Sequence, residues 1–112
     1  MPITNPDYSN LDHEAIAKEI GLKVKHIPIL IGSFLEETPE LLSSLEKEIG
    51  MKNYSSIRAS AHSIKGSAAN LRFNELSLMA KEIEHAASSE DSLFDYVSYV
   101  KAMQKAINSI KI

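Results

Sequence analysis

The apolar side chains of residues 54–71 recur at steps of three and four, and this spacing constrains the fold more than any other feature of the chain. The positions are Tyr54, Ile57, Ala61, Ile64, Ala68 and Leu71. Residues three and four apart share one face of an α-helix, so these side chains form a single stripe that needs a packing partner. The spacing therefore predicts a helix that belongs to a larger helical assembly.

Two helices are predicted before this stretch. Asp12 suits the N-cap of a short first helix and Gly21 suits its end, with Leu11, Ala15, Ile16 and Ile20 facing inward. A long second helix is predicted from about Val24 to Ile49, with an inward seam of Ile27, Ile31, Phe34, Thr38, Leu41, Leu45 and Ile49. Because Pro39 lies far from either end, we expect a kink or a short break around Glu37–Thr38.

Two further helices are predicted after it. Asn74 is expected to cap the fourth helix, and Phe73 to pack on Leu78 as a hydrophobic staple. The inner face of this helix is predicted to hold Leu76, Met79, Ala80, Ile83 and Ala87. The fifth helix is predicted from about Ser92 to Ile110, with a seam of Leu93, Tyr96, Val100, Met103, Ile107 and Ile110.

The connections between these helices are short, which favours antiparallel neighbours. No segment alternates with a period of two, so no sheet is predicted. The predicted fold is all-α, an antiparallel up-and-down four-helix bundle with a short extra N-terminal helix. Residues 1–10, with their two prolines, are interpreted as an extended lead-in, and residues 11–112 as the bundle.

Composition excludes several classes of protein. The chain has 112 residues, no cysteine and a formal net charge of −3, which suits one domain without disulfides and argues against nucleic-acid binding. No apolar run reaches the roughly 18 residues of a membrane span, and the first residues do not resemble a signal peptide. No histidine pair has metal-site spacing, so no metal is assigned. We expect a cytoplasmic monomer, although the apolar seam of the predicted fifth helix would also suit a coiled-coil dimer.

His62 lies beside the buried stripe of residues 54–71, not on it. It follows Ala61 by one residue, which places it about 100° round the helix, at the edge of the core. Lys65 and Gly66 share its face at the third and fourth positions after it. A glycine inside a helix costs about 1 kcal/mol relative to alanine, so we interpret Gly66 as a place where another molecule approaches the helix.

Glu84 is predicted to lie opposite His62. The turn between the third and fourth helices is centred near Phe73, and the two residues stand eleven positions before and after it. Residues equidistant from an antiparallel turn lie side by side, so the carboxylate should reach the imidazole. A hydrogen bond from Nδ1–H to Glu84 would leave the Nε2 lone pair outward as an oriented nucleophile.

Each of these residues also has an ordinary interpretation. A lone helix histidine is usually half-exposed and inert, Lys65 alone is a solvated charge, and Gly66 alone is a helix–helix contact. Glu84 could simply pair with Lys81 or Lys65 on the surface. The four residues together on one face favour a functional site.

Residues 62–71 read HSIKGSAANL, which resembles the signature of histidine-containing phosphotransfer (HPt) domains of phosphorelays. Residues 34–42 and 76–84 also resemble the family pattern, so the likeness covers nearly the whole chain. One departure is Arg72, which stands where the family commonly has glycine, ten residues after the histidine.

The resemblance implies a phosphocarrier and not an enzyme with its own turnover. His62 would accept a phosphoryl group from a receiver-domain aspartate and pass it to another, with response-regulator receivers and a hybrid histidine kinase as partners. Lys65 would supply positive charge for the phosphoryl oxygens, and Ser67 or Asn70 a neutral donor. The chain would hold no cofactor of its own, and Mg²⁺ would come with the receiver.

Docking is expected on a patch that includes the second helix. Ile29, Leu30 and Leu35 add apolar surface beyond the inward seam, and an exposed apolar cluster near a reactive group suggests a contact site. The alternative is that the short first helix covers Ile29. Two other functions stay open, namely a docking adaptor that keeps the fold without the chemistry and the phosphotransfer domain of a chemotaxis-type kinase.

Overall fold

The computed structural model describes residues 3–111, and helices are the only regular structure in that range. The elements in chain order are α1 (His13–Ile20), a single 3₁₀ turn η1 (Val24–His26), α2 (Ile27–Gly50), α3 (Tyr54–Asn70), α4 (Asn74–Ser88) and α5 (Tyr96–Ser109). The all-α prediction is confirmed. The predicted domain boundaries at residues 1 and 112 lie outside the described residues.

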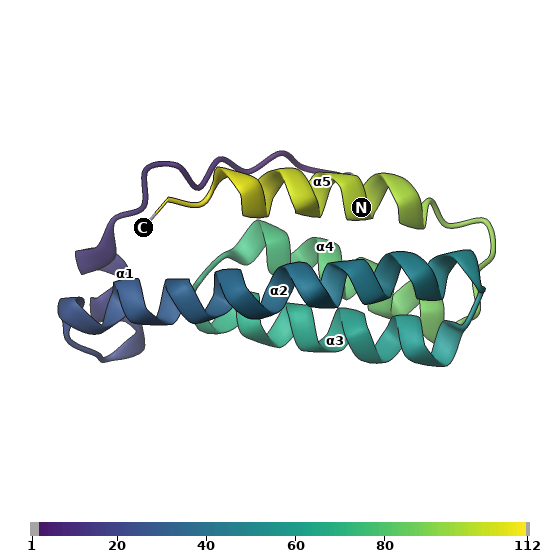
Figure 1. The fold of residues 1–112 in the computed structure, drawn as a ribbon, viewed down its shortest axis with the longest axis horizontal. Helices are drawn as coiled ribbons and strands as arrows, with labels where there is room; N and C mark the ends of the chain where they lie inside the picture. Colours follow the sequence, from purple (N-terminus) through teal and green to yellow (C-terminus); the bar gives the residue numbers. More distant parts are fainter. Residues whose placement is uncertain (1–2, 112) are drawn as a thin grey trace.

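Helices α2 to α5 run alternately up and down around one core, with α1 at one end (Figure 1). Helix α3 packs on α2 and α4, and α5 closes the bundle against the same two helices. The predicted inward stripe of α3 is buried, with its first residue, Tyr54, at the rim. The most deeply buried large apolar residues of the core include Ile27, Ile31, Leu45, Ile57, Ile64, Leu76, Met79, Ile83 and Met103.

Helix α1 has the predicted caps but a different inner face. The Asp12 side chain accepts a hydrogen bond from the Ala15 backbone N–H, and Gly21 takes the left-handed conformation at the end, with φ 74°. Ala17 is buried beside Ile16, while Ala15, which was expected to face inward, is exposed. The face toward α2 is therefore rotated from the predicted one.

Helix α2 runs through Pro39 without interruption, so of the expected kink or short break, the break is wrong. Pro39 removes only one backbone N–H and lies on the exposed side, where water can hydrate the carbonyl that loses its partner. The inward seam also differs at one step. After the buried Thr38 it continues four residues on, at Leu42, and Leu41 is only half-buried.

The last two helices do not begin where predicted: α4 begins one residue earlier and α5 begins later. Phe73, not Asn74, is the N-cap of α4, and Leu78 is 43% exposed, so the expected staple is absent. The Phe73 ring instead packs on the rings of Tyr8 and Phe34, with centroids 4.6 and 5.3 Å away.

Helix α5 starts at Tyr96 because Asp95 caps it, accepting a hydrogen bond from the Ser98 backbone N–H at 3.1 Å. Leu93 therefore lies in the preceding loop. It is 94% exposed, so its predicted place in the α5 seam is wrong.

The segment before α1 follows the flank of α5 (Figure 1). The Tyr8 backbone N–H donates to Ser109 Oγ at 2.9 Å, and the Tyr8 hydroxyl accepts from the Leu76 backbone N–H at 3.3 Å. The ring of Tyr8 covers Phe73. These contacts tie the segment to α4 and α5 at the end of the bundle where α3 turns into α4.

Three helices end on a residue other than glycine in the left-handed region, namely Lys52, Arg72 and Glu90, with φ of 53°, 65° and 50°. After α3, the Arg72 N–H bonds to the Ala69 carbonyl at 3.0 Å and the Phe73 N–H to the Ala68 carbonyl at 2.9 Å. This pair of bonds is a Schellman motif, whose left-handed position favours glycine. The Arg72 guanidinium also donates to the Ala69 carbonyl at 3.0 Å.

We expect Arg72→Gly to be more stable than Arg72→Ala by about 1 kcal/mol, because only the glycine relieves the left-handed strain of a side chain. Both variants lose the guanidinium bond, so the comparison isolates the backbone term. Denaturant unfolding monitored by circular dichroism measures the difference. Equal free energies of unfolding would show that the turn is not strained.

Candidate functional site

His62 lies on the outer flank of α3, between buried core and solvent. Its neighbour Ala61 is completely buried, while the His62 side chain is 66% exposed. The backbone under the ring is therefore held by core packing, and the ring itself is open to an approaching molecule.

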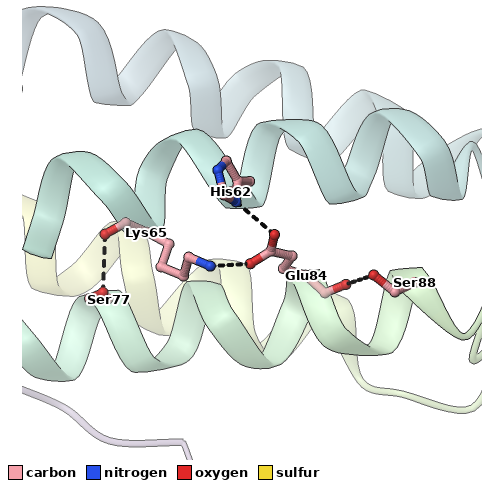
Figure 2. Close-up of polar contacts among 5 residues, drawn as sticks. All are labelled: His62, Lys65, Ser77, Glu84 and Ser88. Atoms are coloured by element: carbon pink, nitrogen blue, oxygen red, sulfur yellow. Dashed lines mark hydrogen bonds and ion pairs between the residues drawn. The ribbon is translucent and has the colours of Figure 1, made fainter.

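The Glu84 carboxylate joins two residues of α3 from its place on α4 (Figure 2). Its Oε2 lies 2.7 Å from Nδ1 of His62, and its Oε1 accepts a hydrogen bond from Nζ of Lys65 at 2.6 Å. An ionised carboxylate only accepts hydrogen bonds, so Nδ1 carries the proton in this contact. In the neutral ring, Nε2 then keeps its lone pair.

The ionisation of Glu84 follows from its surroundings. Burial raises the pKa of the carboxyl. Hydrogen bonds from Lys65 and His62, together with the positive charge of Lys65, lower the pKa by more than burial raises it. The net pKa therefore lies below the usual 4.5. Glu84 is therefore ionised at neutral pH and acts as the acceptor for both neighbours.

Two serines of α4 add bonds around this contact (Figure 2). Ser77 Oγ donates to the Lys65 backbone carbonyl at 3.0 Å, which links the turn of α3 that carries Lys65 to α4. Ser88 Oγ donates to the Glu84 carbonyl at 3.0 Å, within α4. Sequence reasoning missed Ser77, since its acceptor is a backbone group that no spacing rule reveals.

Lys65 lies in the site, but its ammonium does not stand free beside His62. The side chain is 30% exposed, and Nζ is bonded to Glu84. The contact places the positive charge on the carboxylate that holds the imidazole. Its first effect is to neutralise Glu84, and any effect on a group at Nε2 is secondary.

The structure places the remaining predicted site residues along α3 and α2, away from Glu84. Gly66 is exposed, and a Cβ added there would meet no heavy atom within 4 Å. Ser67 and Asn70 line a shallow hollow of about 150 Å³ between α3 and α2. The hollow is completed by Leu30, Ser33, Phe34, Glu37 and Leu71.

Ile29 lies on α2 one turn before Ser33 of that hollow and is 66% exposed. The alternative that α1 covers it is therefore wrong. The hollow that Ser67 and Asn70 line faces α2, so the two predicted donors lie on the α2 side of α3.

A second and larger hollow lies directly beside His62. Its volume is about 510 Å³, and it is lined by Ser55, Arg58, Ala59, His62, Ser63 and Glu84. Arg58 was missed by sequence reasoning, although it stands four residues before His62 and thus on the same helix face. That spacing was the signal that could have found it.

In the part of the chain that the structure describes, the other histidines and acidic groups form no second cluster of this kind. His85 is exposed, as expected from its position on α4. Among the described residues, no group of three or more His, Asp or Glu side chains is placed to hold a metal ion. No helix in residues 3–111 has the length and apolar character to cross a membrane.

The sequence was compared with models of protein families, with curated proteins and with solved structures. The model of the Hpt domain matches residues 29–110, which contain His62, Lys65 and Glu84. Neither the curated proteins nor the solved structures give a match.

Proposed function

The chain belongs to the Hpt domain family, and from this premise we propose that it is a phosphocarrier whose His62 accepts a phosphoryl group from a receiver-domain aspartate and passes it to another. Domains of this family transfer phosphoryl groups through histidine in phosphorelays. The observation that carries the assignment to His62 is its exposed ring, held through Nδ1 by Glu84 at 2.7 Å.

In the proposed step the Nε2 lone pair attacks the phosphorus atom of an aspartyl phosphate. The N–P bond forms as the P–O bond to the aspartate breaks, and the carboxylate leaves with the electron pair. The proton stays on Nδ1, so the ring becomes cationic when it carries the phosphoryl group. Glu84 stabilises this charge as it develops, and the reverse step returns the ring to its neutral form.

Lys65 has a positioning role in this proposal. Its ammonium holds the second oxygen of Glu84, which fixes the direction of the carboxylate toward Nδ1. It also keeps Glu84 ionised by lowering the pKa of the carboxyl. Because the Lys65 ammonium is bonded to Glu84, the carboxylate offsets much of its effect on the phosphoryl oxygens.

The partners in this proposal are receiver domains of response regulators and of a hybrid histidine kinase. They supply the acceptor aspartate and its Mg²⁺, and the chain contributes the nucleophile and no turnover of its own. We place the protein in the cytoplasm as a monomer, with no cofactor, nucleic acid or membrane as partner. The docking surface we propose joins Gly66, Ser67 and Asn70 of α3 with Ile29 of α2.

The direct test is incubation with a receiver domain whose aspartate carries labelled phosphate. We expect the label to move to this protein as an acid-labile, alkali-stable phosphate, which is the stability typical of phosphohistidine. A protein that binds the phosphorylated receiver but takes up no label would contradict the phosphocarrier and support the docking adaptor.

Gly66→Leu should slow phosphoryl transfer from a receiver about tenfold, the effect of about 1.4 kcal/mol of lost docking energy. A Cβ at this position meets no heavy atom within 4 Å and the residue is exposed, so the fold should tolerate the added side chain. Helix propensity should leave the free energy of unfolding unchanged or raise it by up to about 1 kcal/mol.

Gly50→Leu at the end of α2 is the matched control, since a Cβ there also meets no atom within 4 Å. It should leave the transfer rate unchanged. Unfolding of the Gly66→Leu variant would show that Gly66 is a packing residue and that our interpretation of this face is wrong.

Ile29→Asp should weaken receiver binding about tenfold, because a charge would replace apolar contact area at the interface. The side chain is 66% exposed, so the melting temperature should change little. Titration calorimetry with a receiver measures the affinity. The control is Leu93→Asp, an exposed leucine in the loop before α5, and equal affinities of the two variants would remove Ile29 from the docking surface.

A further inference from the structure

The charged groups that are bonded to one another at His62 leave no free cation for a phosphoryl group. Glu84 and Lys65 neutralise each other through the 2.6 Å ion pair, and His62 uses Nδ1 to bond to the same carboxylate. A phosphoryl group adds up to about two negative charges, as other phosphorylated side chains do. These charges would stand in the hollow whose wall includes the Glu84 carboxylate.

Arg58 is the basic residue that lines this hollow together with His62. It lies one turn earlier on α3, at a spacing that puts the two Cβ atoms roughly 5–6 Å apart. Within residues 3–111 its guanidinium has no hydrogen bond or ion pair, and the residue is exposed. A planar guanidinium with several donors matches phosphate oxygens better than an ammonium does.

On the basis of the proposed function, we propose that Arg58 binds the phosphoryl group carried on Nε2 of His62, while Lys65 remains bonded to Glu84. The hollow of about 510 Å³ has room for the group and for the guanidinium. Its α3 residues lie between Ser55 and Ser63, so Arg58 approaches from the N-terminal side of His62. Gly66 on the other side stays free for the receiver.

The division of charges has a consequence for each cation. Removing Lys65 should release Glu84 and disturb the ring before any phosphate arrives. Removing Arg58 should leave the unphosphorylated site unchanged and alter only the phosphorylated form. The two residues can therefore be told apart by comparing free and phosphorylated protein.

The experiment loads the whole protein with phosphoramidate, a small N-phosphoryl donor, so that receiver docking plays no part. Phosphorus NMR at low salt then follows the phosphoryl group through its second ionisation in wild type, Arg58→Gln, Arg58→Lys and Arg72→Gln. A cation about 5 Å away in water-like surroundings lowers such a pKa by about half a unit. We expect Arg58→Gln to raise the midpoint by that amount, Arg58→Lys to raise it less, and Arg72→Gln, the matched arginine control, to leave it unchanged.

Equal midpoints for wild type and Arg58→Gln, with phosphate on His62 in both, would overturn the role of Arg58 and leave the phosphocarrier intact. Failure of the wild-type protein to take phosphate on His62 would overturn both. A change of equal size in Arg72→Gln would also overturn the proposal, because it would show a general charge effect. Nitrogen NMR adds a direct readout, since the Arg58 Nε–H signal should shift on phosphorylation.

Discussion

Replacing His62 by glutamine is expected to reduce phosphorylation of the protein to background. Nε2 of His62 is the proposed nucleophile, and a glutamine amide nitrogen has no lone pair available for attack on phosphorus. The fold should be unaffected because the side chain is 66% exposed, and surface substitutions usually change the free energy of unfolding by less than about 0.5 kcal/mol. Glutamine can still donate a hydrogen bond to Glu84, so a hydrogen bond between α3 and α4 remains possible at this position.

The control set is the same substitution at His13, His26 and His85. These residues lie on α1, η1 and α4, and each variant should accept as much labelled phosphate as wild type. The label is followed with a phosphorylated receiver as donor, and circular dichroism checks the helix content. Undiminished labelling of the His62→Gln protein would remove His62 from the mechanism and leave one of the other three as the acceptor.

Loss of Glu84 should have the next largest effect. Glu84→Ala removes both the acceptor for Nδ1–H and the charge that stabilises the cationic phosphorylated ring. Transfer should therefore slow by roughly tenfold to a hundredfold, which reaches the lower end of the effects known for general acid–base catalysis. The loss should be smaller than that of His62→Gln, because the receiver and its Mg²⁺ supply most of the stabilisation. Glu84→Gln keeps an acceptor oxygen and should lie between wild type and Glu84→Ala.

Nitrogen NMR of the imidazole measures the tautomer in each form, independently of transfer. Glu82→Ala, a carboxylate two residues away on the same helix, is the control and should leave both tautomer and rate unchanged. An identical tautomer population in wild type and Glu84→Ala would show that the carboxylate does not orient the ring in solution.

The pKa of Glu84 sets the pH range of this contact. Because the folded pKa lies below the usual 4.5, the contact stabilises the fold fully above that value and loses this contribution as the pH falls through the folded pKa. The difference in melting temperature between wild type and Glu84→Gln should thus be constant near neutral pH and shrink only in acid. Carbon NMR of the Glu84 carboxyl should give a midpoint below 4.5, and Lys65→Met should raise it.

The helices could be predicted because their buried residues follow one period, but their ends could not. Both Ser92 and Asp95 are good N-caps, and the choice of Asp95 leaves Leu93 in the loop. Within α2, a seam that steps by three or by four after Thr38 gives Leu41 or Leu42, and only packing against the other helices decides. Propensity is nearly equal for such alternatives, so tertiary contacts select one.

The pairing of His62 with Glu84 could be predicted because the connection between α3 and α4 is short, and a short turn fixes the register of the two helices. One residue more in that turn would rotate α4 by about 100° and carry the carboxylate away. The partner of Lys65 stayed open in the sequence. Arg58 shares a helix face with His62 by spacing alone, and the sequence cannot distinguish such a residue from an ordinary solvated surface charge.

His62 stands in the middle of α3, eight residues from Tyr54 and eight from Asn70. The partial charges of a helix macrodipole are confined to its first and last turns, and in mid-helix the amide groups are already bonded to carbonyls of the preceding turn. A phosphoryl group on Nε2 thus has a covalent bond and nearby side-chain charges, without the nest of free amides that holds phosphate in nucleotide-binding loops. Once the N–P bond breaks, only the exposed Arg58 side chain remains to attract the anion, so inorganic phosphate released by hydrolysis should bind weakly and compete little with the next donor.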